Sequence, residues 1–199
     1  MSGAFPISTA KFGTLGIKSI QNTIISKTVS GKKLARQIDN QRWAFSVQII
    51  TAKRSDVYGE LMAFIIKQIS GKENFTIIPP EVEDARGTAS GIPHGTASAG
   101  DTSITLGGTG TGTLKAGDMI KFANHSKVYM VVADQSDIST GTLTIEPPLT
   151  TAVSSSDIQY DNVPFTVHLT NDVQEFGVSG ADKDGNLYYE YQFDVEESL

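Results

Sequence analysis

Hydrophobic and polar residues alternate with a period of two along several parts of the chain, the pattern of half-buried β-strands. The clearest case is residues 43–50, where Trp43, Phe45, Val47 and Ile49 would share one face. Upstream, a weaker alternation that begins at Ile20 reaches a turn at Ser30-Gly31, and a basic strand returns over residues 32–38. We therefore predict a β-hairpin followed by a half-buried strand.

The hydrophobic period changes to that of a helix between residues 56 and 70. The large apolar residues there are spaced by three and four positions: Leu61, Phe64, Ile65 and Ile69. We expect Ser55 to cap the first amides and Gly71 to end the helix in a left-handed conformation. The apolar stripe contains no ionisable residue, so it predicts packing against a sheet. A strand over residues 74–78 follows and is stopped by Pro79-Pro80.

The composition changes after this strand. Glycine, serine and threonine make up 18 of the 27 residues from 87 to 113, and we expect parts of this segment to be flexible loop, with a short strand at residues 101–106. Short β-patterned segments at 119–122, 127–133 and 142–146 are each bounded by turn residues. This spacing predicts a small barrel of the OB-like or SH3-like kind.

The larger alternating pattern returns at residues 163–170 and 187–195. We therefore predict a mainly β (α+β) protein with a discontinuous domain, residues 1–84 and 161–199. This domain would be a β-barrel or sandwich with one helix. Residues 85–160 would be a small β-barrel domain inserted into one of its loops, with a Gly/Ser/Thr-rich entry segment. The alternative is two consecutive domains, in which the last 39 residues would complete the second core.

The charged residues are unevenly distributed. Residues 1–84 carry 11 basic and 7 acidic side chains, whereas residues 85–199 carry 5 basic and 15 acidic ones. This asymmetry indicates either self-association between unlike surfaces or solvated surface charge sorted by chance. A net charge of −6 argues against a general nucleic-acid binder. The longest apolar run, residues 61–66, is far short of the roughly 20 residues that span a bilayer, and residues 1–11 lack the features of a signal peptide.

No pattern of catalytic, cofactor-binding or metal-ligating residues emerges. The absence of cysteine excludes disulfides, thiolate metal sites and a cysteine nucleophile. The glycine-rich run at 107–112 lacks the Lys-Ser or Lys-Thr pair of a phosphate loop. Residues 182–186 could supply calcium ligands, but the turn of a hairpin explains them better. The three histidines, His94, His125 and His168, lie far apart in the sequence. Tyr188, Tyr189, Tyr191 and Trp43 leave a sugar-stacking surface as an alternative.

One set of segments resembles a known family. Phe5-Pro6, the basic hairpin, the strand at 42–47, the helix near 58–69, Gly71 and the strand at 75–79 together resemble the distal tail proteins of bacteriophages. These proteins form the ring that joins the tail tube to the baseplate or tail tip. Some members carry a small OB-like or galectin-like second domain, which residues 85–160 would supply here.

The resemblance implies a structural virion protein and not an enzyme: a hexameric ring in the tail, assembled in the host cytoplasm without cofactors. Its partners would be further copies of the chain, the tail tube protein and baseplate hub or tail tip proteins. It would bind no membrane and make no sequence-specific contacts with nucleic acid. We expect the subunit contact to pair Lys27, Lys32, Lys33 and Arg36 with Asp194, Glu196 and Glu197. The alternatives are a carbohydrate-binding or host-receptor recognition module, or another tail ring such as a tail terminator or tube protein.

Overall fold

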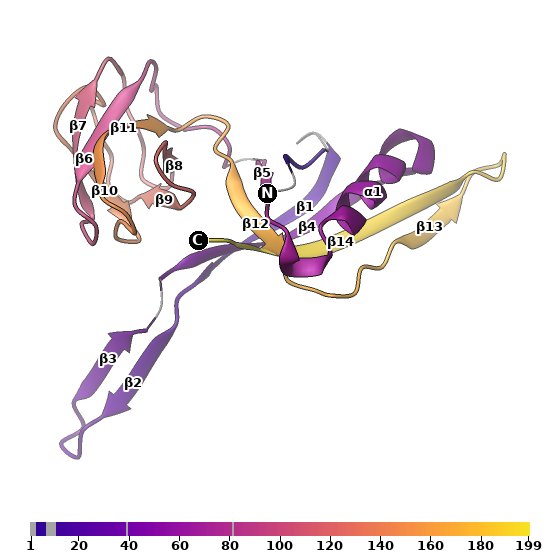
Figure 1. The fold of residues 1–199 in the computed structure, drawn as a ribbon, viewed down its shortest axis with the longest axis horizontal. Helices are drawn as coiled ribbons and strands as arrows, with labels where there is room; N and C mark the ends of the chain where they lie inside the picture. The colour runs from indigo at the N-terminus through magenta and orange to yellow at the C-terminus, as the bar shows by residue number, and fades with distance from the viewer. Residues whose placement is uncertain (1–2, 7–10, 39, 81) are drawn as a thin grey trace.

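The fold consists of an open sheet, a closed barrel and a separate two-stranded hairpin (Figure 1). The computed structural model describes residues 3–6, 11–38, 40–80 and 82–199. The predicted mainly β fold with one α-helix is confirmed. Within the described residues, no helix has the length and apolar character needed to cross a membrane.

The open sheet is antiparallel and has the strand order β1-β4-β14-β12-β5, with β13 added against β14. Its strands are β1 (Phe12–Ile20), β4 (Arg42–Lys53), β5 (Phe75–Ile77), β12 (Phe165–Leu169), β13 (Gly177–Ala181) and β14 (Leu187–Glu197). Four of them, β4, β5, β12 and β14, confirm alternating segments of the sequence. The sequence pattern did not predict β1, because this edge strand is largely exposed and shows no regular burial on alternate residues.

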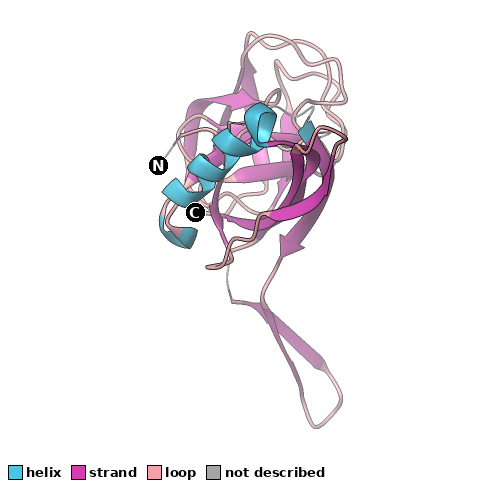
Figure 2. Ribbon diagram, turned by 90° about the vertical axis from the view of Figure 1, so that its right-hand side faces the viewer, coloured by secondary structure: helices cyan, strands magenta, loops and turns pink. Residues whose placement is uncertain are grey.

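The helix α1 (Gly59–Lys67) covers one face of the open sheet, with Leu61 and Ile65 buried beneath it (Figure 2). A π-helical turn (Arg54–Tyr58) precedes it and a 3-10 turn (Ser70–Lys72) follows. Two expectations about its ends were wrong. The Ser55 hydroxyl donates to Asp56 Oδ1 at 3.0 Å instead of capping the helix, and Ile69, with a φ of 50°, is the left-handed residue.

Gly71 has a different role from the predicted one. A Cβ atom at this position would lie 2.7 Å from the carbonyl oxygen of Leu169 on β12. The glycine therefore allows the segment after α1 to approach the sheet closely. From the sequence alone, this close approach cannot be told apart from a helix-ending glycine.

A large hydrophobic core lies between α1 and the open sheet. It includes the alternate apolar residues of β4 and β14 that the sequence placed on one face. The Phe5 ring joins this core with centroid distances of 5.5–6.2 Å to four phenylalanines, Phe12, Phe64, Phe75 and Phe193. The Phe5 amide donates to the carbonyl oxygen of Thr76 at 2.7 Å, so the N-terminal segment covers the outer edge of β5.

The closed barrel has the strand order β10-β7-β6-β11-β8-β9 and encloses a second hydrophobic core. Its strands are β6 (Pro93–Ala97), β7 (Ser103–Gly108), β8 (Met119–Phe122), β9 (Val128–Val131), β10 (Thr142–Glu146) and β11 (Val153–Gln159). The sequence pattern did not predict β6 or β11. The assignment of this barrel to the OB-like or SH3-like kind stays a prediction.

The segments that enter and leave the barrel lie side by side. The Val163 amide donates to the carbonyl oxygen of Glu83 at 3.1 Å, and the Asn162 amide donates to Asp84 Oδ1 at 3.1 Å. Chain ends held this close fit the insertion of one domain into a loop of another. The boundaries at 84/85 and 160/161 stay a prediction.

The remaining hairpin, β2 (Thr23–Lys27) and β3 (Lys33–Gln37), extends away from both the open sheet and the barrel (Figures 1 and 2). Its two strands pair only with each other among the described residues. Gly31, with a φ of 80°, lies in the turn. The predicted basic hairpin is therefore confirmed.

Candidate assembly surfaces

The hairpin at residues 23–37, here named the basic arm, carries four positive charges and no negative one. The basic residues, Lys27, Lys32, Lys33 and Arg36, are all exposed. Lys27 and Lys33 face each other across the two strands, so their side chains share one face. The opposite face carries Arg36 beside Ile24. The structure therefore brings the four predicted basic residues together on one projecting element.

The basic arm also exposes apolar side chains. Ile24, Ile25 and Leu34 are 57%, 54% and 49% exposed. An isolated two-stranded hairpin is at best marginally stable in water, and its unpaired strand edges can pair with another chain. A projecting hairpin with exposed isoleucines and a uniform charge is therefore suited to packing against another molecule.

The predicted acidic residues lie on β14, away from the basic arm, and are divided between the two faces of the sheet. Asp194 accepts a hydrogen bond from the Ser46 hydroxyl, whose oxygen in turn accepts one from Lys18 Nζ at 3.0 Å. Glu196 pairs with Arg42 at 3.0 Å. Both residues lie on the polar face of the sheet, opposite α1, and have partners within the chain.

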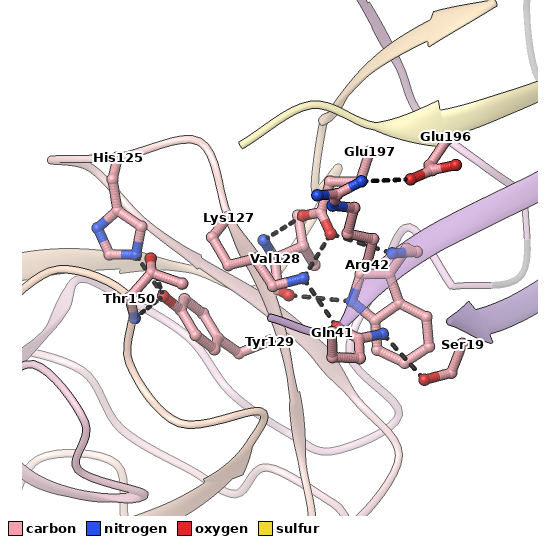
Figure 3. A network of polar contacts seen from close by, with 11 residues as sticks. Ser19, Gln41, Arg42, His125, Lys127, Val128, Tyr129, Thr150, Glu196 and Glu197 are labelled. Carbon is pink, nitrogen blue, oxygen red and sulfur yellow. Dashed lines mark hydrogen bonds and ion pairs between the residues drawn. The ribbon is translucent and has the colours of Figure 1, made fainter. Parts of the chain in front are cut away.

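Glu197 lies on the other face and is buried where the barrel meets the open sheet (Figure 3). Its carboxylate forms an ion pair with Lys127 and accepts hydrogen bonds from the amides of Trp43, at 3.1 Å, and Val128, at 2.8 Å. The position of Glu197 gives it an intramolecular role and leaves it no surface for another subunit. The subunit contact as a whole stays a prediction.

Lys127 completes this junction from the barrel side. Its Nζ donates to Gln41 Oε1 at 2.8 Å as well as to Glu197, and the Trp43 indole N–H donates to the carbonyl oxygen of Val128 at 3.0 Å. Burial lowers the pKa of Lys127, although the Glu197 carboxylate acts in the opposite direction. The junction joins β4 and β14 to β9 through polar groups that all have partners.

The sequence contained a signal for this junction. Glu197 continues the alternation of Tyr191, Phe193 and Val195, which places a carboxylate on the buried face of β14. A buried carboxylate needs a cation or several donors. The alternation thus indicated that Glu197 has a partner, whereas the identity of Lys127, 70 residues away, required the fold.

A second polar cluster lies in the barrel, around His125. Its Nδ1 lies 2.8 Å from Asn124 Oδ1, and its Nε2 lies 2.8 Å from the Tyr129 hydroxyl. That hydroxyl accepts a hydrogen bond from the Thr150 amide at 3.1 Å. Burial, with a smaller contribution from Lys121, lowers the pKa of His125. A neutral imidazole that donates from Nδ1 and accepts at Nε2 satisfies this arrangement.

The other residues considered for metal or sugar binding do not come together in one site. His94 Nδ1 lies 2.8 Å from Asp157 Oδ1 on the barrel, whereas His168 lies on β12. Asp182 closes the predicted turn, where its carboxylate accepts from the amides of Asp184 and Asn186, each at 2.9 Å. In the described part of the chain, no three His, Asp or Glu residues are close enough to hold a metal ion. Trp43 is buried at the junction and offers no stacking surface.

Comparison with known proteins bears on the barrel. Residues 84–163 match the family described as distal tail protein pb9, B domain. Residues 84–163 are similar to this domain and are named the B domain below. The match covers the whole closed barrel and both connecting segments, and it confirms the resemblance of the chain to bacteriophage distal tail proteins. The match supports a structural role in the bacteriophage tail. No curated protein matched the chain.

Proposed function

We propose that the chain forms an oligomeric ring in the bacteriophage tail, of six subunits, which joins the tail tube to the baseplate or tail tip. The observation that carries this proposal is the basic arm, a projecting hairpin whose exposed isoleucines and four positive charges lie away from the chain's own core. Its partners would be further copies of the chain, the tail tube protein and baseplate hub or tail tip proteins. The ring would assemble in the host cytoplasm and have no enzymatic activity.

The open sheet supports a head-to-tail ring. One edge is β1, whose outer side has no strand partner among the described residues, while the other edge is the short β5, covered by the segment at residues 3–5. Contacts between unlike surfaces generate a ring when the rotation between subunits closes. In such a ring the polar face of the sheet, which carries Lys18, Ser46 and Asp194, would be free to line a central channel.

The domain division is part of the same proposal. Residues 1–84 and 161–199 would form the ring-forming domain, and the B domain would project from it. The buried junction at Glu197 supports a fixed orientation of the B domain, because the groups that meet there lose their partners when the domains separate.

The proposal is tested by the mass of the purified protein in solution together with negative-stain images. We expect rings that dissociate as salt is raised, because screening weakens contacts between exposed charges. Lys32→Glu with Lys33→Glu should weaken the ring and reduce its salt dependence. Lys67, at the end of α1, and Lys72, after it, are exposed. Lys67→Glu with Lys72→Glu therefore provides a matched reversal outside the arm. An equal effect of both pairs would contradict a role of the basic arm.

A further inference from the structure

The molecule has a second projecting hairpin, here named the acidic arm and comprising residues 172–190. It contains β13 and the first part of β14 and carries five acidic residues and one basic one. We infer that the acidic arm is the surface on which the basic arm of a second copy docks. This inference rests on the proposed ring and identifies the receiving surface within it.

The two arms lie at opposite ends of the molecule (Figure 1). A contact between the basic arm of one copy and the acidic arm of the next leaves one arm of each kind free on the pair. Further copies can therefore add in the same manner until the ring closes. The placement of the arms favours a head-to-tail contact over a two-fold symmetric one, which pairs the same patch of both copies.

The net charges of the arms are equal and opposite: +4 on the basic arm and −4 on the acidic arm. Part of the acidic charge has local partners. Asp182 pairs with Lys53 at 2.9 Å, and Asp184 pairs with Lys183 at 3.0 Å. Among the described residues, Glu175 and Glu190 have no ion-pair partner. These two carboxylates are therefore the groups that an incoming lysine would meet.

Glu175 and Glu190 line one open groove at the base of the acidic arm. The groove has a volume of about 330 Å³, and Gln48, Gln192 and Gly177 contribute to its wall. The base of the arm is held in place by Tyr191, whose ring stacks on Phe176 with centroids 4.3 Å apart. A groove on a fixed element gives the lysines of the basic arm a preformed site.

The acidic arm also offers apolar side chains and an unpaired strand edge to the basic arm of a second copy. The acidic arm exposes Val178 and Leu187, at 54% and 45%, as the basic arm exposes isoleucines. The outer edge of β13 has no strand partner within the described residues. Exposed strand edges bind extended segments of other chains through backbone hydrogen bonds. The surface thus offers apolar contact and pairing in addition to charge.

This receiving surface differs from the one expected from the sequence. Asp194 and Glu196 are engaged by Ser46 and Arg42 in the same chain, and Glu197 is buried at the junction. Binding a second copy through these residues would require these contacts to break. The unpaired carboxylates of the acidic arm carry no such cost.

A charge-swap experiment tests the inference. Lys27→Glu/Lys33→Glu and Glu175→Lys/Glu190→Lys would each be made in the full chain, and self-association would be measured by analytical ultracentrifugation. Each pair should weaken association at least tenfold, since like charges placed opposite each other repel. The quadruple variant should recover most of the affinity and thereby show that the variants fold. As a matched comparison of the two acidic surfaces, both would also be neutralised, and Glu175→Gln/Glu190→Gln should weaken association more than Asp194→Asn/Glu196→Gln.

The outcomes separate this inference from the proposed ring. Rings that persist unchanged in Glu175→Lys/Glu190→Lys would overturn the arm contact and leave the ring standing. Loss of association in both charge-reversed pairs without recovery in the quadruple variant would also overturn the arm contact. A wild-type chain that stays monomeric at every concentration measured would overturn both.

Discussion

Lys127 of the barrel and Glu197 of β14 form an ion pair that is buried between the barrel and the open sheet, with both side chains at most 1% exposed. Around the pair lie the amides of Trp43 on β4 and Val128 on β9 and the side chain of Gln41, just before β4 (Figure 3). Removing one member of a buried pair leaves the other charge desolvated and uncompensated. The orientation of the B domain therefore depends on both residues.

Lys127→Met should destabilise the chain by about 3–5 kcal/mol, the usual cost of breaking a buried ion pair. Urea unfolding followed by the fluorescence of Trp43, the only tryptophan, measures this loss directly at the junction. Lys115→Met is the control, because it removes an exposed pair with Asp134 and should change stability by at most about 1 kcal/mol. Similar losses in both variants would refute the importance of the buried junction.

Gly95→Ala should destabilise the barrel by about 1–3 kcal/mol through overpacking. A Cβ atom at this position would lie 2.6 Å from a ring carbon of Phe122 and 2.9 Å from a methyl carbon of Ile104. Gly107→Ala on the adjacent strand β7 is the matched control, since its Cβ atom would meet no atom within 4 Å. Thermal unfolding compares the stability of the two variants, and equal melting temperatures would contradict the close packing of Phe122 and Ile104 against Gly95.

His125 should make the stability of the chain depend on pH. Its pKa is lowered in the folded state by burial and Lys121, so the unfolded chain binds a proton more readily. The stability from the neutral imidazole is complete above the unfolded pKa of about 6.5 and is lost as the pH falls through the folded pKa. Urea titrations at a series of pH values should show a shallower decline in His125→Gln. Identical pH profiles would contradict this prediction.

Asp182 should act as a turn residue and not as a calcium ligand. Hydrogen bonds from Lys53, Asn186 and the Asp184 amide hold its pKa below the usual range, so the carboxylate stays charged at neutral pH. Asp182→Ala should speed amide exchange over residues 181–187, whereas Lys183→Ala should not, because Lys183 pairs only with its neighbour Asp184. Adding calcium should leave the melting temperature unchanged, and an increase would reveal a metal site.

Sequence patterns predicted those strands whose two faces meet different environments. β4 and β14 alternate over residues 45–50 and 191–197 because α1 covers one face and the other stays polar. β1 was not predicted because most of its residues are exposed on both faces. β6 was not predicted because it lies in the segment rich in glycine, serine and threonine. Only the approach of the Phe122 ring to Gly95 shows why a small residue is needed there.

Of the two charged surfaces, the basic one could be predicted from the sequence and the acidic one could not. The four charges of the basic arm were predictable, because a hairpin holds residues that are near in sequence near in space. The acidic surface was not, because the partners of Glu196 and Glu197 lie about 150 and 70 residues away. Only the fold shows that these carboxylates are engaged and that Glu175 and Glu190 line an open groove.

The sequence by itself determined the mainly β class, the existence of one helix, the basic hairpin and the faces of the long strands. These features follow from local periodicity and turn residues, whose physical causes act over a few positions. The tertiary structure decided the strand order of the barrel, the burial of Glu197 against Lys127 and the placement of the two arms at opposite ends. Those features depend on contacts between distant segments, and the free energy of such contacts is set by packing and desolvation that no local pattern records.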